Sequence, residues 1–189
     1  MGPLRPAALR PFEPATRCAY LTHGHPTAAL SAGALALIVH RLVAGESLEQ
    51  AVQHAMERLA RYPAHEETTG ALRVAIHRAG RLSASAMAVE SIGQGWIAEE
   101  SLAIAIYCAL AEPDPRQALL LAVNHSGDSD STGAICGNLL GTWHVVEALP
   151  SDWSDAVEGR DTIATIADDF TAAFTSGLPA ERAARYPSA

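Results

Sequence analysis

The sequence predicts an all-α protein, and three observations point to this class. Alanine, the strongest helix former, makes up about a fifth of the 189 residues. Apolar residues recur at helical spacing in segments that begin at capping residues or proline and end near glycine. No β-branched run alternates with polar residues for long enough to predict a strand.

The helices can be placed in order along the chain. We expect the Pro- and Arg-rich residues 1–13 to be loosely ordered and a short helix to follow at 14–22. Pro26 suits the first position of a second helix, which ends at Gly45. Ser47 with Gln50 forms a capping-box pattern for a third helix that ends before Pro63. Further helices are expected over 65–79, 84–91, 98–111, 114–124, 131–148 and 161–175.

Short loops between these helices favour compact packing in a single domain over residues 1–189. The last segment, 177–189, is expected to form a short helix and a loosely ordered tail. A chain of this length can bury about 70% of its unfolded surface, so it needs no disulfide or metal to build a core. The three cysteines, Cys18, Cys108 and Cys136, have neither zinc nor redox spacing, which favours a reducing, cytoplasmic setting.

The composition excludes several functions. The formal net charge is -8, which argues against nucleic-acid binding through a basic face. All 13 basic residues are arginine, so a Schiff-base lysine and a phosphate-loop lysine are both excluded. The sequence shows no secretion signal, and its longest apolar stretches, such as 32–39, are too short to cross a bilayer. We therefore expect no membrane partner.

The most informative segment is Asn-His-Ser-Gly-Asp-Ser-Asp-Ser-Thr-Gly at 124–133. Asp128 and Asp130 can converge with the Ser131 hydroxyl if the segment is a loop, since side chains two apart on a helix diverge. Oxygen donors of this kind suit a hard cation such as Mg²⁺, Mn²⁺ or Ca²⁺. The alternative is a capping loop, because Asp and Ser are common first residues before a helix.

Three other segments leave alternatives open. The Leu-Thr-His-Gly-His-Pro run around His23 can contact a phosphate or sugar, or can be a polar turn with one histidine capping a helix. The run Gly93-Gln-Gly95-Trp96 is a glycine-rich loop that enters a helix, and Trp96 alone would more often be a core residue. The glycines at 133, 137 and 141 form a smooth helix face, which suits close helix packing or leaves room for a ligand.

Three ordered segments resemble the ADP-ribosylglycohydrolases: LTHGHPTAALSAGALAL, GQGWIAEESLAIAIYCAL and AVNHSGDSDSTGAICGNLLGTWH. The segment ALPSDWSDAVEGRDTIATIADDF looks like the usual end of that family. The resemblance runs from about residue 16 to 175 and is most specific at Asp-Ser-Asp-Ser.

The resemblance implies a compact orthogonal helical bundle with a two-Mg²⁺ centre and an ADP-ribosylated protein or small molecule as partner. The family's Asp-x-Asp-[Ser/Thr] segment ligates metal, which maps onto Asp128, Asp130 and Ser131. His23 stands where family members place a histidine near ADP-ribose, and the loop with Gly93, Gly95 and Trp96 lines the same cleft.

The family also begins with helices that carry a Thr-Asp-Asp metal-binding run and an acidic catalytic residue, and nothing before Cys18 resembles either. We expect the chain to correspond to the C-terminal part of such an enzyme, with the catalytic residue unidentified and a further chain as a possible source of the missing segment. Two functions stay open, a hydrolase that removes ADP-ribose and a noncatalytic ADP-ribose-binding or structural module.

Overall fold

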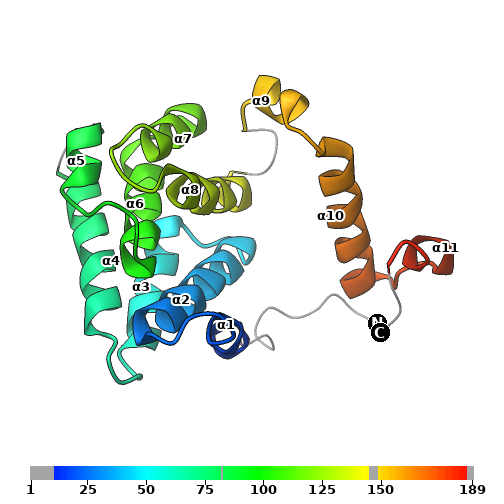
Figure 1. Ribbon diagram of the computed structural model, residues 1–189, viewed down its shortest axis with the longest axis horizontal. Coiled ribbons are helices and arrows are strands. Elements are labelled where there is room, and N and C mark those ends of the chain that lie inside the picture. Colours follow the sequence, from blue (N-terminus) through cyan, green and yellow to red (C-terminus); the bar gives the residue numbers. More distant parts are fainter. Residues whose placement is uncertain (1–10, 82, 145–148, 187–189) are drawn as a thin grey trace. The chain divides into compact units, whose positions relative to one another are not determined.

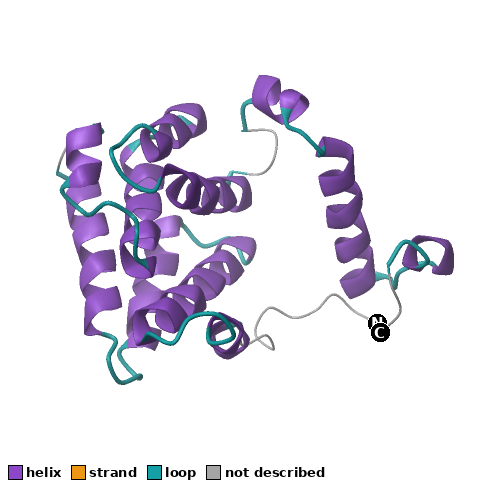
Figure 2. Ribbon diagram, in the orientation of Figure 1, coloured by secondary structure: helices purple, strands orange, loops and turns teal. Residues whose placement is uncertain are grey.

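A computed structural model of the chain describes residues 11–81, 83–144 and 149–186. Every regular element in these ranges is a helix, which confirms the all-α class (Figure 2). The described residues divide into two compact units, 11–149 and 150–186. The expectation of one domain over 1–189 stays a prediction.

The larger unit contains eight helices within the described residues (Figure 1). Their order is α1 (Phe12–Ala19), α2 (Pro26–Val43), α3 (Leu48–Leu59), α4 (Glu66–Ala79), α5 (Ala86–Glu90), α6 (Ala98–Ala111), α7 (Pro115–Val123) and α8 (Ser129–Trp143). The smaller unit contains α9 (Ser151–Ala156), α10 (Arg160–Thr175) and α11 (Ala180–Ala183).

Helix α6 is the centre of the larger unit, because it packs against α2, α4, α7 and α8. Its residues from Ser101 to Ala109 are all buried, including Tyr107 and Cys108. A helix that is apolar all round can only be stable when it is surrounded in this way. The N-terminus of α6 therefore has a fixed place in the core, and it fixes the end of the glycine-rich loop that leads into it.

Helix α1 is fixed to the bundle by a polar and aromatic cluster. Phe12 stacks on Tyr62 with ring centroids 4.9 Å apart, and Arg58 lies over both rings. The carboxylate of Glu13 accepts a 2.8 Å hydrogen bond from the Tyr62 hydroxyl and pairs with Arg58. These contacts anchor α1 to α3, and they therefore fix the position at which the turn between α1 and α2 begins.

Helix α2 satisfies the length and hydropathy of a membrane span, with mean hydropathy 1.4 over 18 residues. The sequence-based expectation considered only uninterrupted apolar runs and so missed it. In the structure 44% of this segment is buried in the bundle. Its alanines raise the mean hydropathy, and its glycine, Gly33, allows α1 to approach closely.

Several helix boundaries differ from the sequence predictions, and α1 also ends at Ala19 rather than 22. Helix α1 begins at Phe12 rather than 14, because Pro14 is tolerated in a first turn. Helix α8 begins at Ser129 rather than 131, and residues 145–148 of its predicted extent lie outside the described residues. Helix α9 was not predicted. The expected loose order of 1–10 and of 187–189 also falls outside the described residues.

The capping box at Ser47 is present as predicted. The Ser47 hydroxyl accepts from the backbone N–H of Gln50, and the Gln50 side chain accepts from the Ser47 N–H. We expect Ser47→Ala to lower the free energy of unfolding by about 1 kcal/mol, because one N-terminal N–H of α3 loses its partner. Urea unfolding followed by circular dichroism measures this. Gln53→Ala, at an exposed position on the same helix, is the control and should leave stability unchanged.

Candidate functional site

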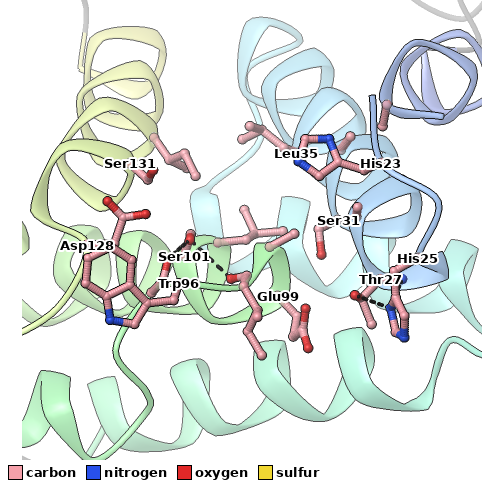
Figure 3. A pocket seen from close by; sticks show the side chains of 18 of the residues that line it. His23, His25, Thr27, Ser31, Leu35, Trp96, Glu99, Ser101, Asp128 and Ser131 are labelled. Atoms are coloured by element: carbon pink, nitrogen blue, oxygen red, sulfur yellow. Dashed lines mark hydrogen bonds between the residues drawn. The ribbon is translucent and has the colours of Figure 1, made fainter. Parts of the chain in front are cut away.

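A cavity of about 850 Å³ opens between α2, the N-terminus of α6 and the N-terminus of α8 (Figure 3). Three of the segments singled out in the sequence meet there. The described residues that line it are Ala19, His23, His25, Thr27, Ala28, Ser31, Ala32, Leu35, Glu67, Gly95, Trp96, Ile97, Ala98, Glu99, Ser101, Leu102, Asp128, Ser131 and Ile135.

The glycine-rich loop is held in shape by the helix that follows it. The carboxylate of Glu100 accepts hydrogen bonds from the backbone N–H groups of Gln94 at 2.9 Å and Gly95 at 3.1 Å. The Ser101 hydroxyl donates to the Gly95 carbonyl. Gly95 has φ +80°, which favours glycine, and Gly93 lies so close to the Glu100 carboxyl group that a Cβ there would be 2.4 Å from its carbon.

The same loop is joined to the Asp-Ser-Asp-Ser segment through backbone atoms. The N–H of Asp128 donates to the Gln94 carbonyl at 2.8 Å. A Cβ on Gly127 would lie 1.8 Å from that carbonyl oxygen, so only glycine fits without a shift of one of the two segments. Two motifs more than 30 residues apart are therefore fixed to each other at one edge of the cavity.

The turn before α8 is also held by side chains. His125 Nδ1 accepts from the Gly127 N–H at 3.0 Å, so the ring proton is on Nε2, which lies 3.0 Å from the Thr132 hydroxyl oxygen. The buried Thr132 hydroxyl lies 2.6 Å from the Ala122 carbonyl at the end of α7, to which it donates. On the outer side, the Ser126 N–H donates to the Glu90 carboxylate at 3.2 Å.

The three predicted metal ligands lie within one helical turn of each other. Asp128 is the residue before α8, with non-helical φ -77° and ψ 81°, whereas Asp130 and Ser131 belong to the first turn of α8. The expectation that the whole segment is a loop was therefore wrong beyond Asp128. Asp128 and Ser131 line the cavity, while Asp130 is exposed and is absent from the lining.

Hydrogen bonding with the Asp130 carboxyl group and with Ser131 holds the pKa of Asp128 below its usual value. These side chains are therefore close enough to act on one another, and all three carry the hard oxygen donors that Mg²⁺ prefers. Among the described residues no group of three or more His, Cys, Asp or Glu side chains gathers to hold a metal ion. The donor set fits part of a Mg²⁺ shell, about half of its six positions, and the assignment of these residues as ligands stays a prediction.

The two histidines before α2 have different environments. His25 caps α2, because its Nδ1 lies 3.4 Å from the Thr27 N–H and 2.8 Å from the Thr27 hydroxyl. His23 lines the cavity, and its Nδ1 lies 2.8 Å from the hydroxyl of Thr22. The capping interpretation thus describes His25, although both histidines line the cavity.

The aromatic residue of the glycine-rich loop is not in the core. Trp96 is 66% exposed and lines the cavity, so the interpretation as a core residue was wrong. Gly95 also lines the cavity, whereas Gly93 does not and shapes the loop through its contact with Glu100.

Sequence reasoning missed several polar residues of the cavity, among them Ser31, Glu67 and Glu99. Glu99 and Glu100 both lie in the first turn of α6, where a negative charge is favourable for the helix dipole. In the structure they separate, since Glu100 binds the loop backbone and Glu99 lines the cavity. Adjacent residues on a helix differ by about 100° in direction, and this is the one signal that could have distinguished them.

The glycine face of α8 packs closely, as the first of its two interpretations predicted. A Cβ on Gly133 would lie 2.6 Å from a methyl group of Val123, and Gly137 faces Leu119. Neither glycine lines the cavity. Cys136 on the same helix is buried, and its burial raises the pKa of the thiol to about 12, which suits a packing role.

Comparison with known proteins extends the resemblance. Residues 2–179 match the family model described as ADP-ribosylglycohydrolase. The chain is 29% identical over 101 residues to ADP-ribosylhydrolase ARH3 from Bos taurus, covering 48% of this chain and 28% of that protein. It is 30% identical over 84 residues to the Homo sapiens protein of the same name, covering 39% and 23%.

A protein of Escherichia coli (strain K12), described as "Uncharacterized protein YegU", is 29% identical over 140 residues, covering 68% of this chain and 42% of that protein. The aligned part is thus less than half the length of each of these relatives. No solved structure matches the chain significantly. Because the family model spans most of the sequence, the chain belongs to the ADP-ribosylglycohydrolase family.

Proposed function

We propose that the cavity binds the ADP-ribosyl group of a modified protein or small molecule. We also propose that the chain is part of a hydrolase that removes ADP-ribose with the help of Mg²⁺. One observation carries this proposal. His23, Gly95, Trp96, Asp128 and Ser131 come from three separate segments and line one cavity. Two relatives are named ADP-ribosylhydrolases, which supports the same class of reaction.

The charge of the cavity explains why a cation belongs to this proposal. Glu67, Glu99 and Asp128 line it, and none of its described lining residues is an arginine. A diphosphate is anionic, so these carboxylates repel it unless a cation lies between them. Asp128, Asp130 and Ser131 would hold Mg²⁺, which when bound would neutralise this charge and orient ribose hydroxyls and water.

The remaining residues would position the ligand. The hydrogen bonds of Glu100 and of the Asp128 N–H fix the glycine-rich loop, so Trp96 is presented at the cavity edge on a rigid support. His23 offers an imidazole on the opposite side of the cavity (Figure 3). Fixed groups of this kind orient a substrate at low entropic cost, which is a major part of enzymatic rate enhancement.

We expect ADP-ribose to bind the chain only in the presence of Mg²⁺, and Asp128→Asn to weaken this binding by at least about tenfold, because the cation loses a charged ligand. Isothermal titration calorimetry with and without Mg²⁺ measures both effects. Asp161→Asn removes the same charge from an exposed position on α10 and should leave binding unchanged. Metal-independent binding that Asp128→Asn does not alter would contradict the proposal.

The alternative function is a noncatalytic ADP-ribose-binding or structural module. The predicted metal site favours this alternative, because its three oxygen donors fill only about half of a Mg²⁺ shell. The other half is left to groups outside this set. An assay of ADP-ribose release from ADP-ribosylated arginine and serine compounds, with Mg²⁺, separates the two functions. Release supports the hydrolase, and binding without release supports the module.

A further inference from the structure

A second groove, of about 500 Å³, runs between α3 and α4 and shares no lining residue with the cavity described above. Glu67 of α4 lines the cavity, whereas Thr69 of the same helix lines the groove. Side chains two positions apart on a helix point about 200° apart, so α4 separates the two hollows. The described residues that line this α3–α4 groove are Gln53, Met56, Glu57, Ala60, His65, Thr69, Arg73, Ile76 and His77.

The α3–α4 groove is long and narrow along α4. Four of its residues, His65, Thr69, Arg73 and His77, follow one another at intervals of four, so they form a row along one side of the helix. Twelve residues of helix span about 18 Å. An extended peptide covers this distance with about five residues. The length of the row therefore suits a peptide segment rather than a single amino acid or a phosphate ion.

The rim of the groove carries unpaired hydrogen-bond donors. Arg73 is exposed and forms no ion pair or hydrogen bond with any residue that the structure describes, and the same holds for His77. The nearby Arg58 differs, because it pairs with Glu13. Arg78 is also occupied, since it donates to the Ser91 hydroxyl.

His65, at the other end of the row, is already held. Its Nδ1 lies 3.0 Å from the hydroxyl oxygen of the buried Thr69, and its Nε2 lies 3.8 Å from the Glu66 carboxylate. The donors left for a ligand are therefore those of Arg73 and His77.

The charge around the groove favours an acidic ligand. Residues 58–81 contain five arginines and two glutamates, although the whole chain has a formal net charge of -8. A basic region on an acidic chain attracts anions locally. Glu57 opposes this attraction, and among the described lining residues it is the one carboxylate.

The groove also offers an apolar surface, formed by Met56, Ala60 and Ile76. Methionine is flexible and adapts to different side chains, which is why it is frequent at peptide-binding surfaces. Successive side chains of an extended peptide point to opposite sides. A segment that alternates acidic and apolar residues can therefore place its apolar side chains in the groove and its carboxylates at the exposed rim.

We propose that the α3–α4 groove binds such an extended segment of another protein, with acidic and apolar side chains in alternation. Its carboxylates accept hydrogen bonds from Arg73 and His77, and its apolar side chains contact Met56 and Ile76. This inference goes beyond the proposed function, because the segment needs neither ADP-ribose nor Mg²⁺ to bind.

Titration of the full chain with the blocked peptide Ac-Glu-Leu-Glu-Leu-Glu-NH₂, without Mg²⁺ or ADP-ribose and followed by NMR chemical shifts, tests the groove. We expect saturable binding that Arg73→Gln weakens by about fivefold, since an exposed charge pair is lost. Glu57→Gln should strengthen binding by about twofold, because it removes a like charge. Raising NaCl from about 0.05 M to about 0.5 M should weaken binding by screening these charges.

The matched control is Arg17→Gln, which makes the same change of charge at an exposed position on α1 and should leave binding unchanged. A peptide with lysine in place of glutamate should not bind. The proposal is overturned if the glutamate peptide does not bind, or if wild type and Arg73→Gln bind it equally while circular dichroism shows both folded. Weaker binding by Glu57→Gln would also overturn it. These variants change no residue of the cavity, so the result does not depend on whether the cavity binds ADP-ribose.

Discussion

Gly127→Ala is expected to lower the free energy of unfolding by about 3 kcal/mol, at the upper end of the usual cost of overpacking. The added Cβ would lie 1.8 Å from the Gln94 carbonyl oxygen and 2.6 Å from its carbon. These are backbone atoms, so no rotamer change relieves the overlap. The turn before α8 must move away from the glycine-rich loop, and the hydrogen bond from the Asp128 N–H to Gln94 is lost.

Urea unfolding measures this loss, and Gly24→Ala is the matched control. Gly24 lies in the turn before α2, where an added Cβ would have no heavy atom within 4 Å, and it does not need a positive φ. It should change stability by less than about 0.5 kcal/mol. If Gly127→Ala unfolds at the wild-type urea concentration, the close approach of the two motifs is wrong.

Thr132→Val is the second change with a large expected effect, a loss of about 2 kcal/mol of stability. Valine has nearly the same shape, so packing is kept while the hydroxyl is removed. The hydroxyl lies at 2.6 Å from the Ala122 carbonyl and 3.0 Å from His125 Nε2, and the residue is fully buried. Its removal leaves both groups without this partner, and the Ala122 carbonyl lies in a buried region.

Thr142→Val on the same helix is the control. Its hydroxyl also donates to a backbone carbonyl, that of Asn138 at 2.7 Å, but this bond is exposed and water can replace it. The control should change stability by less than about 0.5 kcal/mol. Equal midpoints in thermal unfolding for Thr132→Val and Thr142→Val would show that the Thr132 hydroxyl does not hold the turn.

Much of the fold could be predicted because the chain marks its helices locally. The predicted helix 98–111 matches α6, since its start and its apolar run are both encoded within the segment. The start of α8 was missed by two residues, because Ser129 and Asp130 are as common in a preceding loop as in a first helical turn. Helix α9 was missed because it is short and none of its described residues is buried, so it lacks an apolar pattern.

The candidate site was less accessible to sequence reasoning. The segments carrying His23, Gly95 and Asp128 could be recognised because each has a distinctive local pattern. Glu67 and Ser31 have none, and only packing of α4 and α2 around α6 brings them to the cavity. The exposure of Trp96 likewise depends on how the loop before α6 is held, which no local pattern specifies.

The contact between Gly127 and Gln94 has a consequence for how the sequence can vary. It is made by the carbonyl group of residue 94, which every amino acid possesses, rather than by the glutamine side chain. Any residue type at 94 would present the same oxygen, so no substitution there compensates for a larger residue at 127. Position 127 is thus constrained while position 94 is free to drift. Positions 94 and 127 would therefore show no correlated substitution between homologues. They would show none even though the two backbones approach each other here more closely than side chains would allow.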